Sequence, residues 1–422
     1  MTEENIELSI RSALIPVFYQ TFRCLAQDCW DSCCVGWDIY FDKKDYLRLR
    51  RLDAPGDLQE RLERGVRRIR GEENVGGKKY GRFDVKGNSD ACPFLDQDGL
   101  CAIQKACGHE VLPFVCKTYP RFTSYSIAAK EYSLSPSCEG VLQQLWQLPD
   151  GIEFIEDPLP KTEQRHITIP RGESLALYFA PVRSLFIDIL QNRALSLTER
   201  MLYLGITVQR LQKEDLAGFD PDRWADQAAS MADAGMIREM AADIVGNRNM
   251  YLLQNLNVLG RIAMKERNWP AEISAVLEAR QETETVSKGD DGMNAKIQFK
   301  TVFSAKAYED ALAQFQAAFS GYEYFFENLM VASALYMQFP DLSSRELLWK
   351  SYVSLCNLYS LFRFVSVLGC KGNATKERLF HMIVMASRST LHNRDLFQGF
   401  QEDLFEHDSS TLAHMAILLR WD

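Results

Sequence analysis

Nine of the eleven cysteines lie in the first third of the 422-residue chain, and this crowding constrains the fold more than any other feature. Several thiolates held close together repel one another unless a cation shares their charge. Soft sulfur ligands select zinc, copper(I) or iron–sulfur clusters over magnesium or calcium. The crowding therefore predicts a soft-metal site built from these cysteines: Cys24, Cys29, Cys33, Cys34, Cys92, Cys101, Cys107, Cys116 and Cys138.

The spacing of these cysteines favours an iron–sulfur cluster over zinc. The first group reads Cys24-x4-Cys29-x3-Cys33-Cys34, and a proline follows Cys92 directly. Zinc sites usually contain C-x2-C pairs, which this chain lacks, whereas irregular spacing and a cysteine followed by proline are familiar around iron–sulfur clusters. The alternative is a structural metal site that only stabilises a loop-rich domain.

Composition and charge exclude several other classes of protein. Lys and Arg number 48 against 57 Asp and Glu, and the net charge of -9 argues against a nucleic-acid-binding protein. No run approaches the roughly 20 apolar residues of a membrane span, so we expect no membrane segment. The start MTEENIELSI is acidic, unlike a signal peptide, which favours a cytoplasmic protein with reduced thiols. No two glycines are separated by one residue, so the usual dinucleotide-binding loop is absent.

The chain is expected to be mainly α-helical, with two domains of different character. Residues 1–150 are predicted to form a loop-rich, cysteine-cluster domain that binds the metal. A Pro-rich, acidic segment predicts a linker over 151–172. From 173 to 422, apolar residues recur at intervals of three and four, which predicts an α-helical bundle domain. Cys356 and Cys370 are expected in its core, because free cysteine is among the most buried residue types.

Three shorter segments carry local predictions. Residues 43–70 read as two helices broken near Pro55-Gly56. Residues 71–91 are rich in glycine and polar residues around a short strand-like run, which predicts a small hairpin. The composition of residues 281–296 predicts a polar exposed loop.

The cysteine segments resemble the flagellin lysine-N-methylase family and, more distantly, bacterial cysteine-cluster proteins that chelate zinc or iron. The distinctive motifs all lie in the first third of the chain. The matching segments are FRCLAQDCWDSCCVGWDIYFDK at 22–43, CPFLDQDGLCAIQ at 92–104, LPFVCKTYPRF at 112–122, SLSPSCEG at 133–140 and, more loosely, YEYFFENLMVASALYMQFP at 322–340.

This resemblance implies methyl transfer from S-adenosylmethionine to surface lysines of flagellin, with an iron–sulfur cluster held by the cysteine segments. The usual radical loop C-x3-C-x2-C is absent, because Val35-Gly36 stands where its third cysteine would fall. Polar transfer, in which a neutral lysine amine attacks the sulfonium methyl group, is therefore the simpler mechanism. The implied metal ligands are eight thiols, more than the four that one [4Fe-4S] cluster needs. They belong to Cys24, Cys29, Cys33, Cys34, Cys92, Cys101, Cys116 and Cys138.

Aromatic and acidic residues beside these cysteines are candidates for the reaction site. We assign Trp30, Trp37 and Arg121 to cofactor binding. For the two tryptophans the reason is that aromatic faces attract a sulfonium or a methylated ammonium. The alternative is that these side chains pack around the metal site. Asp31 and Tyr119 are the candidate catalytic proton acceptors.

A second class of function is compatible with the same residues. A non-catalytic iron- or zinc-binding module, or a redox sensor, would also need the cysteines and would use the helical domain to dock a protein partner. Iron content does not separate the two classes, whereas methyl transfer to a protein lysine does.

Overall fold

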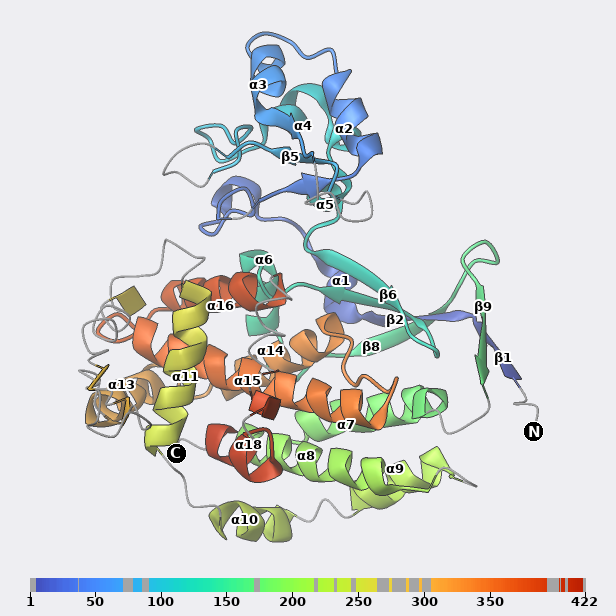
Figure 1. The fold of residues 1–422 in the computed structure, drawn as a ribbon, viewed down its shortest axis with the longest axis vertical. Helices are drawn as coiled ribbons and strands as arrows, with labels where there is room; N and C mark the ends of the chain where they lie inside the picture. Colours follow the sequence, from blue (N-terminus) through green and yellow to red (C-terminus); the bar gives the residue numbers. More distant parts are fainter. Residues whose placement is uncertain are drawn as a thin grey trace.

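The structure is a computed structural model, and the expected mainly α-helical fold is confirmed. The described chain has a small N-terminal module, a central sheet and a large helical body (Figure 1). The described residues are 5–36, 38–70, 79–85, 91–170, 175–215, 219–230, 234–243, 248–263, 273–274, 286–287, 296–297, 305–392, 402, 404–406 and 409–419.

The N-terminal module has a hydrophobic core separate from that of the helical body. It contains the antiparallel strands β3 (Tyr40–Phe41), β5 (Gly81–Phe83) and β4 (Val66–Arg68), in this order, and the helices α2 (Lys43–Arg50), α3 (Leu58–Gly65), α4 (Ala102–Cys107) and α5 (Phe114–Thr118). The buried rings of Phe41, Phe83 and Phe94 meet edge to face in its core. The buried Asp45 accepts a hydrogen bond from the backbone N–H of Phe114, which fixes α5 against α2.

The central sheet joins this module to the helical body (Figure 1). Its strands, in spatial order, are β6 (Arg121–Tyr125), β7 (Lys130–Leu134), β2 (Ser12–Pro16) and β8 (Phe154–Pro158). Strand β2 runs parallel to β7 and antiparallel to β8. A separate pair is formed by β1 (Asn5–Ile10) and β9 (Arg165–Pro170). Two helices, α1 (Val17–Thr21) and α6 (Glu139–Trp146), carry apolar side chains from this layer into the core of the helical body.

The helical body is built around one long helix, α15 (Arg345–Gly369). The surrounding elements are η5 (Leu175–Tyr178), α7 (Phe179–Gln191), α8 (Leu197–Lys213), α9 (Pro221–Ser230), α10 (Ala234–Asp243), α11 (Arg248–Ala263), α13 (Ala305–Ala318), α14 (Glu323–Tyr336), α16 (Lys376–Leu391) and α18 (Leu412–Leu419). Among the described residues, α15 is the one helix long and apolar enough to cross a membrane, and 94% of that stretch is buried inside the protein. Its place in the core accounts for its hydropathy. Cys356 and Cys370 are both buried, as predicted.

The local predictions meet different outcomes. The two helices predicted over 43–70 are present, on either side of Pro55-Gly56. Of residues 71–91, predicted as a small hairpin, the structure describes 79–85 and 91. The strand-like run is found as β5, which pairs with β3 and with β4, a strand that precedes the segment. The segment 151–172, predicted as a linker, instead contains strands β8 and β9. Their last residues are prolines on sheet edges, where a missing N–H interrupts no ladder.

Most of the polar loop predicted over 281–296 lies outside the described residues. The parts that are described belong to two short antiparallel strands, β10 (Val286–Ser287) and β11 (Lys296–Ile297).

A buried group of charges fastens α14 to α8. Glu327 is 2% exposed, and its carboxylate receives Arg200 Nη1 at 2.6 Å and Arg193 Nη2 at 2.9 Å. Arg200 also donates to the backbone carbonyl groups of Leu190 and Leu195, so its charge is well satisfied. Removing one member of such a group leaves an uncompensated buried charge.

We therefore expect Glu327→Ala to lower the free energy of unfolding by about 3 to 5 kcal/mol. Urea denaturation followed by far-ultraviolet circular dichroism measures this change. The control is Asp310→Ala, which removes an exposed ion pair with Lys306 on α13 and should leave the unfolding midpoint nearly unchanged. Equal shifts for the two variants would contradict the structural role of Glu327.

Candidate functional site

The first cysteine segment, residues 24–36, forms a loop over the start of α6, and we call it the cysteine loop. Glu139, the first residue of α6, is fully buried. Its Oε2 atom accepts the backbone N–H groups of Trp30 at 2.7 Å and Asp31 at 3.1 Å, and lies 3.4 Å from Sγ of Cys29. Because a buried carboxylate without partners is costly, these contacts hold the cysteine loop on α6.

Arg388 on α16 holds the other side of the cysteine loop. Its Nη2 atom donates to the carbonyl oxygens of Asp31 at 2.7 Å and Ser32 at 3.3 Å, and its Nη1 atom donates to that of Val35 at 3.4 Å. Hydrogen bonds from a charged donor contribute about 1.5 to 3 kcal/mol each. The cysteine loop is therefore fixed to α6 and α16, two helices that are far apart in the sequence.

A carboxylate–imidazole pair lies where the cysteine loop meets α16. Oδ1 of Asp31 is 2.7 Å from Nδ1 of His381, and the two side chains are 10% and 33% exposed. His381 and Arg388 are seven residues apart, about two helical turns, so they lie on one face of α16. When a carboxylate fixes one imidazole nitrogen, the other can exchange a proton with a bound substrate. Asp31 and His381 together can therefore form a site that accepts a proton.

Tyr119, the other candidate proton acceptor, lies in a hydroxyl network. Its Oη atom is 3.0 Å from Oγ of Ser137, which is 2.7 Å from Nε2 of His392. Burial raises the pKa of Tyr119 well above 10. A phenol that stays neutral is a poor proton acceptor, so Asp31 is the better candidate of the two.

The eight predicted metal ligands fall into two groups, and three of the four cysteines of the first group lie in the N-terminal module. Cys92, Cys101 and Cys116 pack against the core of that module, and burial, with repulsion from a neighbouring thiolate, raises the pKa of Cys92 and of Cys116. Cys34 of the cysteine loop interacts with all three, and its carbonyl oxygen accepts the backbone N–H of Cys92 at 2.7 Å. Burial raises the pKa of Cys92 to about 12. We call these four side chains the module thiols.

The second group, which we call the loop thiols, consists of Cys24, Cys29, Cys33 and Cys138. Cys138 immediately precedes α6 and packs against the core of the helical body. Besides burial, repulsion by a Cys138 thiolate raises the pKa of Cys29 and Cys33, and repulsion by a Cys24 thiolate raises that of Cys138. Burial raises the pKa of Cys138 to about 11. Of the loop thiols, Cys138 thus belongs to the helical body.

Cys33 and Cys34 connect the two groups, because they are neighbours in the chain. A hydrogen bond between their sulfur atoms lowers the pKa of Cys34 to about 7 and raises that of Cys33 well above 9. All eleven cysteines are free thiols. Across the described residues, no three or more His, Cys, Asp or Glu side chains converge as a set that could hold a metal ion. Metal binding by the N-terminal domain therefore stays a prediction.

The three candidates for cofactor binding differ in their surroundings. The indole of Trp30 is 59% exposed, so it is free to meet a ligand. Trp37 lies outside the described residues. The guanidinium of Arg121 lies over the rings of Tyr19, at 5.5 Å, and Phe22, at 5.1 Å, and donates to the carbonyl of Phe22. These contacts favour the packing role for Arg121.

Sequence reasoning missed the side chains that hold the cysteine loop. Glu139 directly follows Cys138 in the segment SPSCEG, and the sequence pattern predicted a role for the cysteine only. His381 and Arg388 lie within a helical pattern that reads as structural. Their spacing of seven, which places two polar groups on one face of a largely buried helix, is the signal that could have found them.

The protein is mainly α-helical, and two of its helices, α6 and α16, hold a cysteine-rich loop in place. Residues 183–418 match the family described as FliB lysine N-methylase C-terminal domain, and this range is more than half of the chain. It includes all of α16, and therefore His381 and Arg388. The chain belongs to the FliB lysine N-methylase family, which confirms the resemblance found in the sequence.

Curated relatives agree with this assignment. The chain is 29% identical over 192 residues to the lysine-N-methylase of Salmonella typhimurium (strain LT2), and the match covers 44% of each chain. It is 30% identical over 176 residues to the flagellar biosynthetic protein FliU of Salmonella muenchen, covering 39% of this chain and 95% of that protein. The chain thus spans less than half the length of the lysine-N-methylase it matches. No solved structure matches it significantly.

The anchoring of the cysteine loop by Arg388 can be tested by hydrogen exchange. We expect Arg388→Ala to speed amide exchange in residues 24–36 by about 10-fold or more, since at least one charge-assisted hydrogen bond of about 1.5 kcal/mol is lost. Mass spectrometry of the exchanged peptides measures the rates. Glu377→Ala, an exposed position on the same helix, is the matched control and should leave these peptides unchanged. Unchanged exchange in Arg388→Ala would show that the loop is held by other contacts.

Proposed function

We propose that this chain is a protein lysine N-methyltransferase that modifies flagellin, with S-adenosylmethionine as the methyl donor. Membership of the FliB lysine N-methylase family supports the reaction. The relative named flagellar biosynthetic protein FliU supports a flagellar substrate. In this proposal the reaction takes place between Asp31 of the cysteine loop and His381 of α16.

The Asp31–His381 pair is the observation that carries the proposal. A free lysine has a pKa near 10.4 and is protonated at neutral pH, so its ammonium group must lose a proton before it can attack. Asp31 orients His381 through the 2.7 Å contact at Nδ1, which leaves Nε2 to accept that proton. The lysine nitrogen then bonds to the methyl carbon as the carbon–sulfur bond breaks. S-adenosylmethionine supplies the electrophilic methyl group, and S-adenosylhomocysteine leaves.

We also propose that the module thiols, Cys34, Cys92, Cys101 and Cys116, hold an iron–sulfur cluster. Four free thiols are a donor set of the number and softness that such a cluster requires. Three of them belong to the N-terminal module and one to the cysteine loop. The cluster would therefore fasten the module to the loop, and the proposed role of these residues is structural.

The proton-accepting pair leads to a kinetic prediction. We expect Asp31→Asn and His381→Gln each to lower the rate constant of methyl transfer by about 100-fold or more, with little change in KM, because general base catalysis contributes about that much. Transfer of labelled methyl groups to purified flagellin measures the rate. The exposed Glu377→Gln, on the same helix as His381, should keep the wild-type rate.

Comparison of flagellin from cells with and without the protein tests the substrate itself. Methylated lysines are expected by mass spectrometry only in the first. Identical lysine methylation in the two samples would refute the assignment and favour the non-catalytic metal-binding or redox-sensing module.

Metal content tests the proposed cluster separately. Protein purified without oxygen is expected to contain iron and acid-labile sulfide, and Cys101→Ser is expected to lose both. The matched control is Cys107→Ser, because Cys107 packs against the same module core but is not one of the module thiols. Stoichiometric zinc without iron or sulfide, in protein never exposed to air, would exclude the cluster.

A further inference from the structure

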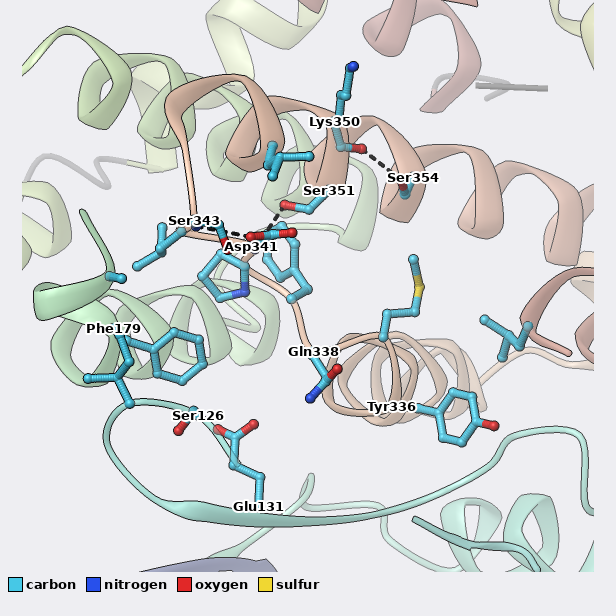
Figure 2. A pocket seen from close by; sticks show the side chains of 18 of the residues that line it. Ser126, Glu131, Phe179, Tyr336, Gln338, Asp341, Ser343, Lys350, Ser351 and Ser354 are labelled. Atoms are coloured by element: carbon cyan, nitrogen blue, oxygen red, sulfur yellow. Dashed lines mark hydrogen bonds between the residues drawn. The ribbon is translucent and has the colours of Figure 1, made fainter. Parts of the chain in front are cut away.

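A cavity of about 690 Å³ lies between the central sheet and the helical body, and two acids face it (Figure 2). Glu131 on β7 is 4% exposed and pairs with Arg183 on α7 at 3.4 Å. The side chain of Asp341 accepts the backbone N–H of Ser343 at 3.0 Å. Each of these two acids therefore has a partner within the protein.

A second cavity, of about 490 Å³, has a lining of different character. Its walls come from the loop between α7 and α8, the first turn of α8, the facing sides of α13 and α14, and the middle of α15. Pockets for small molecules commonly have volumes of about 300 to 1,000 Å³. Its lining includes neither the cysteine loop nor α16, so this cavity is separate from the Asp31–His381 pair.

Positive charge prevails in the lining of this second cavity. Three arginines and two glutamates line it, and one of the glutamates, Glu323, is exposed. The buried carboxylate of Glu327 is shared by Arg193 and Arg200. Arg193 uses Nε and Nη2 for this contact, and its side chain is 41% exposed. Its remaining nitrogen, Nη1, is therefore available to a ligand, and guanidinium groups favour carboxylate and phosphate ligands.

A buried hydroxyl in the same lining lacks a partner. Tyr359 on α15 is 5% exposed and lines the cavity. Among the described residues, its hydroxyl group forms no hydrogen bond. Leaving a buried polar group unsatisfied costs about 1 to 3 kcal/mol, so such a group in a native protein needs an explanation. A polar group of a ligand in the cavity would supply the missing hydrogen bond.

Aromatic rings form much of the remaining wall. Phe315 and Phe319 meet with ring centroids 4.8 Å apart, and both line the cavity. Tyr322, 39% exposed, lines it as well and stacks on Trp146 of α6 at 4.2 Å. Ring faces of this kind favour a flat aromatic ligand over a branched aliphatic one. Through Trp146, the cavity adjoins the helix whose first residue, Glu139, holds the cysteine loop.

We propose that this second cavity binds a small aromatic anion, a flat ring that carries a carboxylate or a phosphate group. The anionic group would accept a hydrogen bond from Arg193, the hydroxyl of Tyr359 would bond to a polar atom of the ligand, and the ring would pack against Phe315 and Phe319. The ligand is neither the methyl donor nor the lysine, because the cavity is separate from Asp31 and His381. The inference does not rest on the proposed function.

Calorimetric titration of the full chain with three naphthalene compounds tests the ligand class. The compounds are naphthoate, naphthyl phosphate and the neutral naphthamide, which share one ring system and differ in charge. We expect at least one of the two anions to bind about 10-fold or more tightly than the amide, since the amide lacks the charge-assisted hydrogen bond. The anion that binds more tightly shows whether the natural group is a carboxylate or a phosphate.

Substitution of Arg193 tests the position of the anionic group. Arg193→Gln is expected to weaken the preferred anion by about 10-fold or more and to leave naphthamide unchanged. The fold should be kept, because Arg200 still pairs with Glu327. Arg223→Gln makes the same charge change at an exposed position of α9 outside the cavity, and should bind all three compounds as the wild type does.

Two further variants separate loss of the ligand site from loss of folding. Tyr359→Phe removes only a hydroxyl without a partner in the described chain, so it should weaken the anion by about 3-fold or more with an unchanged melting temperature. Gln316→Trp places a large ring at the cavity from an exposed position of α13 and is expected to block all three compounds. Circular dichroism melting curves check that both variants fold.

The remaining outcomes contradict the inference. Anions that bind no more tightly than naphthamide would show an apolar cavity without an anion site. Anion binding that is the same in wild type, Arg193→Gln and Gln316→Trp would place the site elsewhere on the protein. No binding of any of the compounds by the wild type would overturn the inference outright. None of these measurements involves methyl transfer, so failure of the proposed function would leave their meaning unchanged.

Discussion

The buried carboxylate of Glu139 is the interaction on which the site depends. It is 0% exposed, and Oε2 gathers two backbone N–H groups and a thiol of the cysteine loop while Oε1 accepts the side chain of Gln143. A charge at that depth is tolerated only with such partners, so α6 and the loop must form together. Arg388 completes the arrangement from α16 with a charge of opposite sign. Between these two anchors, Asp31 is brought to His381.

In this chain the family's helical domain and the cysteine-rich segment each supply part of the site. The helical body supplies His381 and Arg388, and the cysteine loop supplies Asp31 and two cysteines, Cys33 and Cys34, that lead to different thiol groups. Cys138 packs on the core of the helical body, whereas Cys92, Cys101 and Cys116 pack on the core of the module. A metal bound by the module thiols would thus influence the position of the loop that carries Asp31.

Sequence patterns predicted the parts of the fold that depend on neighbouring residues. The break near Pro55-Gly56 and the long helices after 173 follow from local geometry and periodicity. Strands β8 and β9 were missed because proline composition suggested a linker, while pairing with β2 and β1 is a long-range property. Long-range contact also explains why the sequence predicted Asp31 but not His381 as part of the site. Asp31 stands out beside cysteines, but His381 is 350 residues away, and its meaning comes from a contact that no local pattern contains.

The central claim is that Asp31 and His381 form a methyl-transfer site in a protein lysine methyltransferase. The most direct measurement incubates the anaerobically purified chain with flagellin and S-adenosylmethionine labelled in its methyl group, and compares the wild type with Asp31→Asn. The account predicts label on flagellin lysines with the wild type and a loss of about 100-fold or more in the variant. Label that is absent with a folded, metal-loaded wild type, or equal in the two proteins, would contradict it.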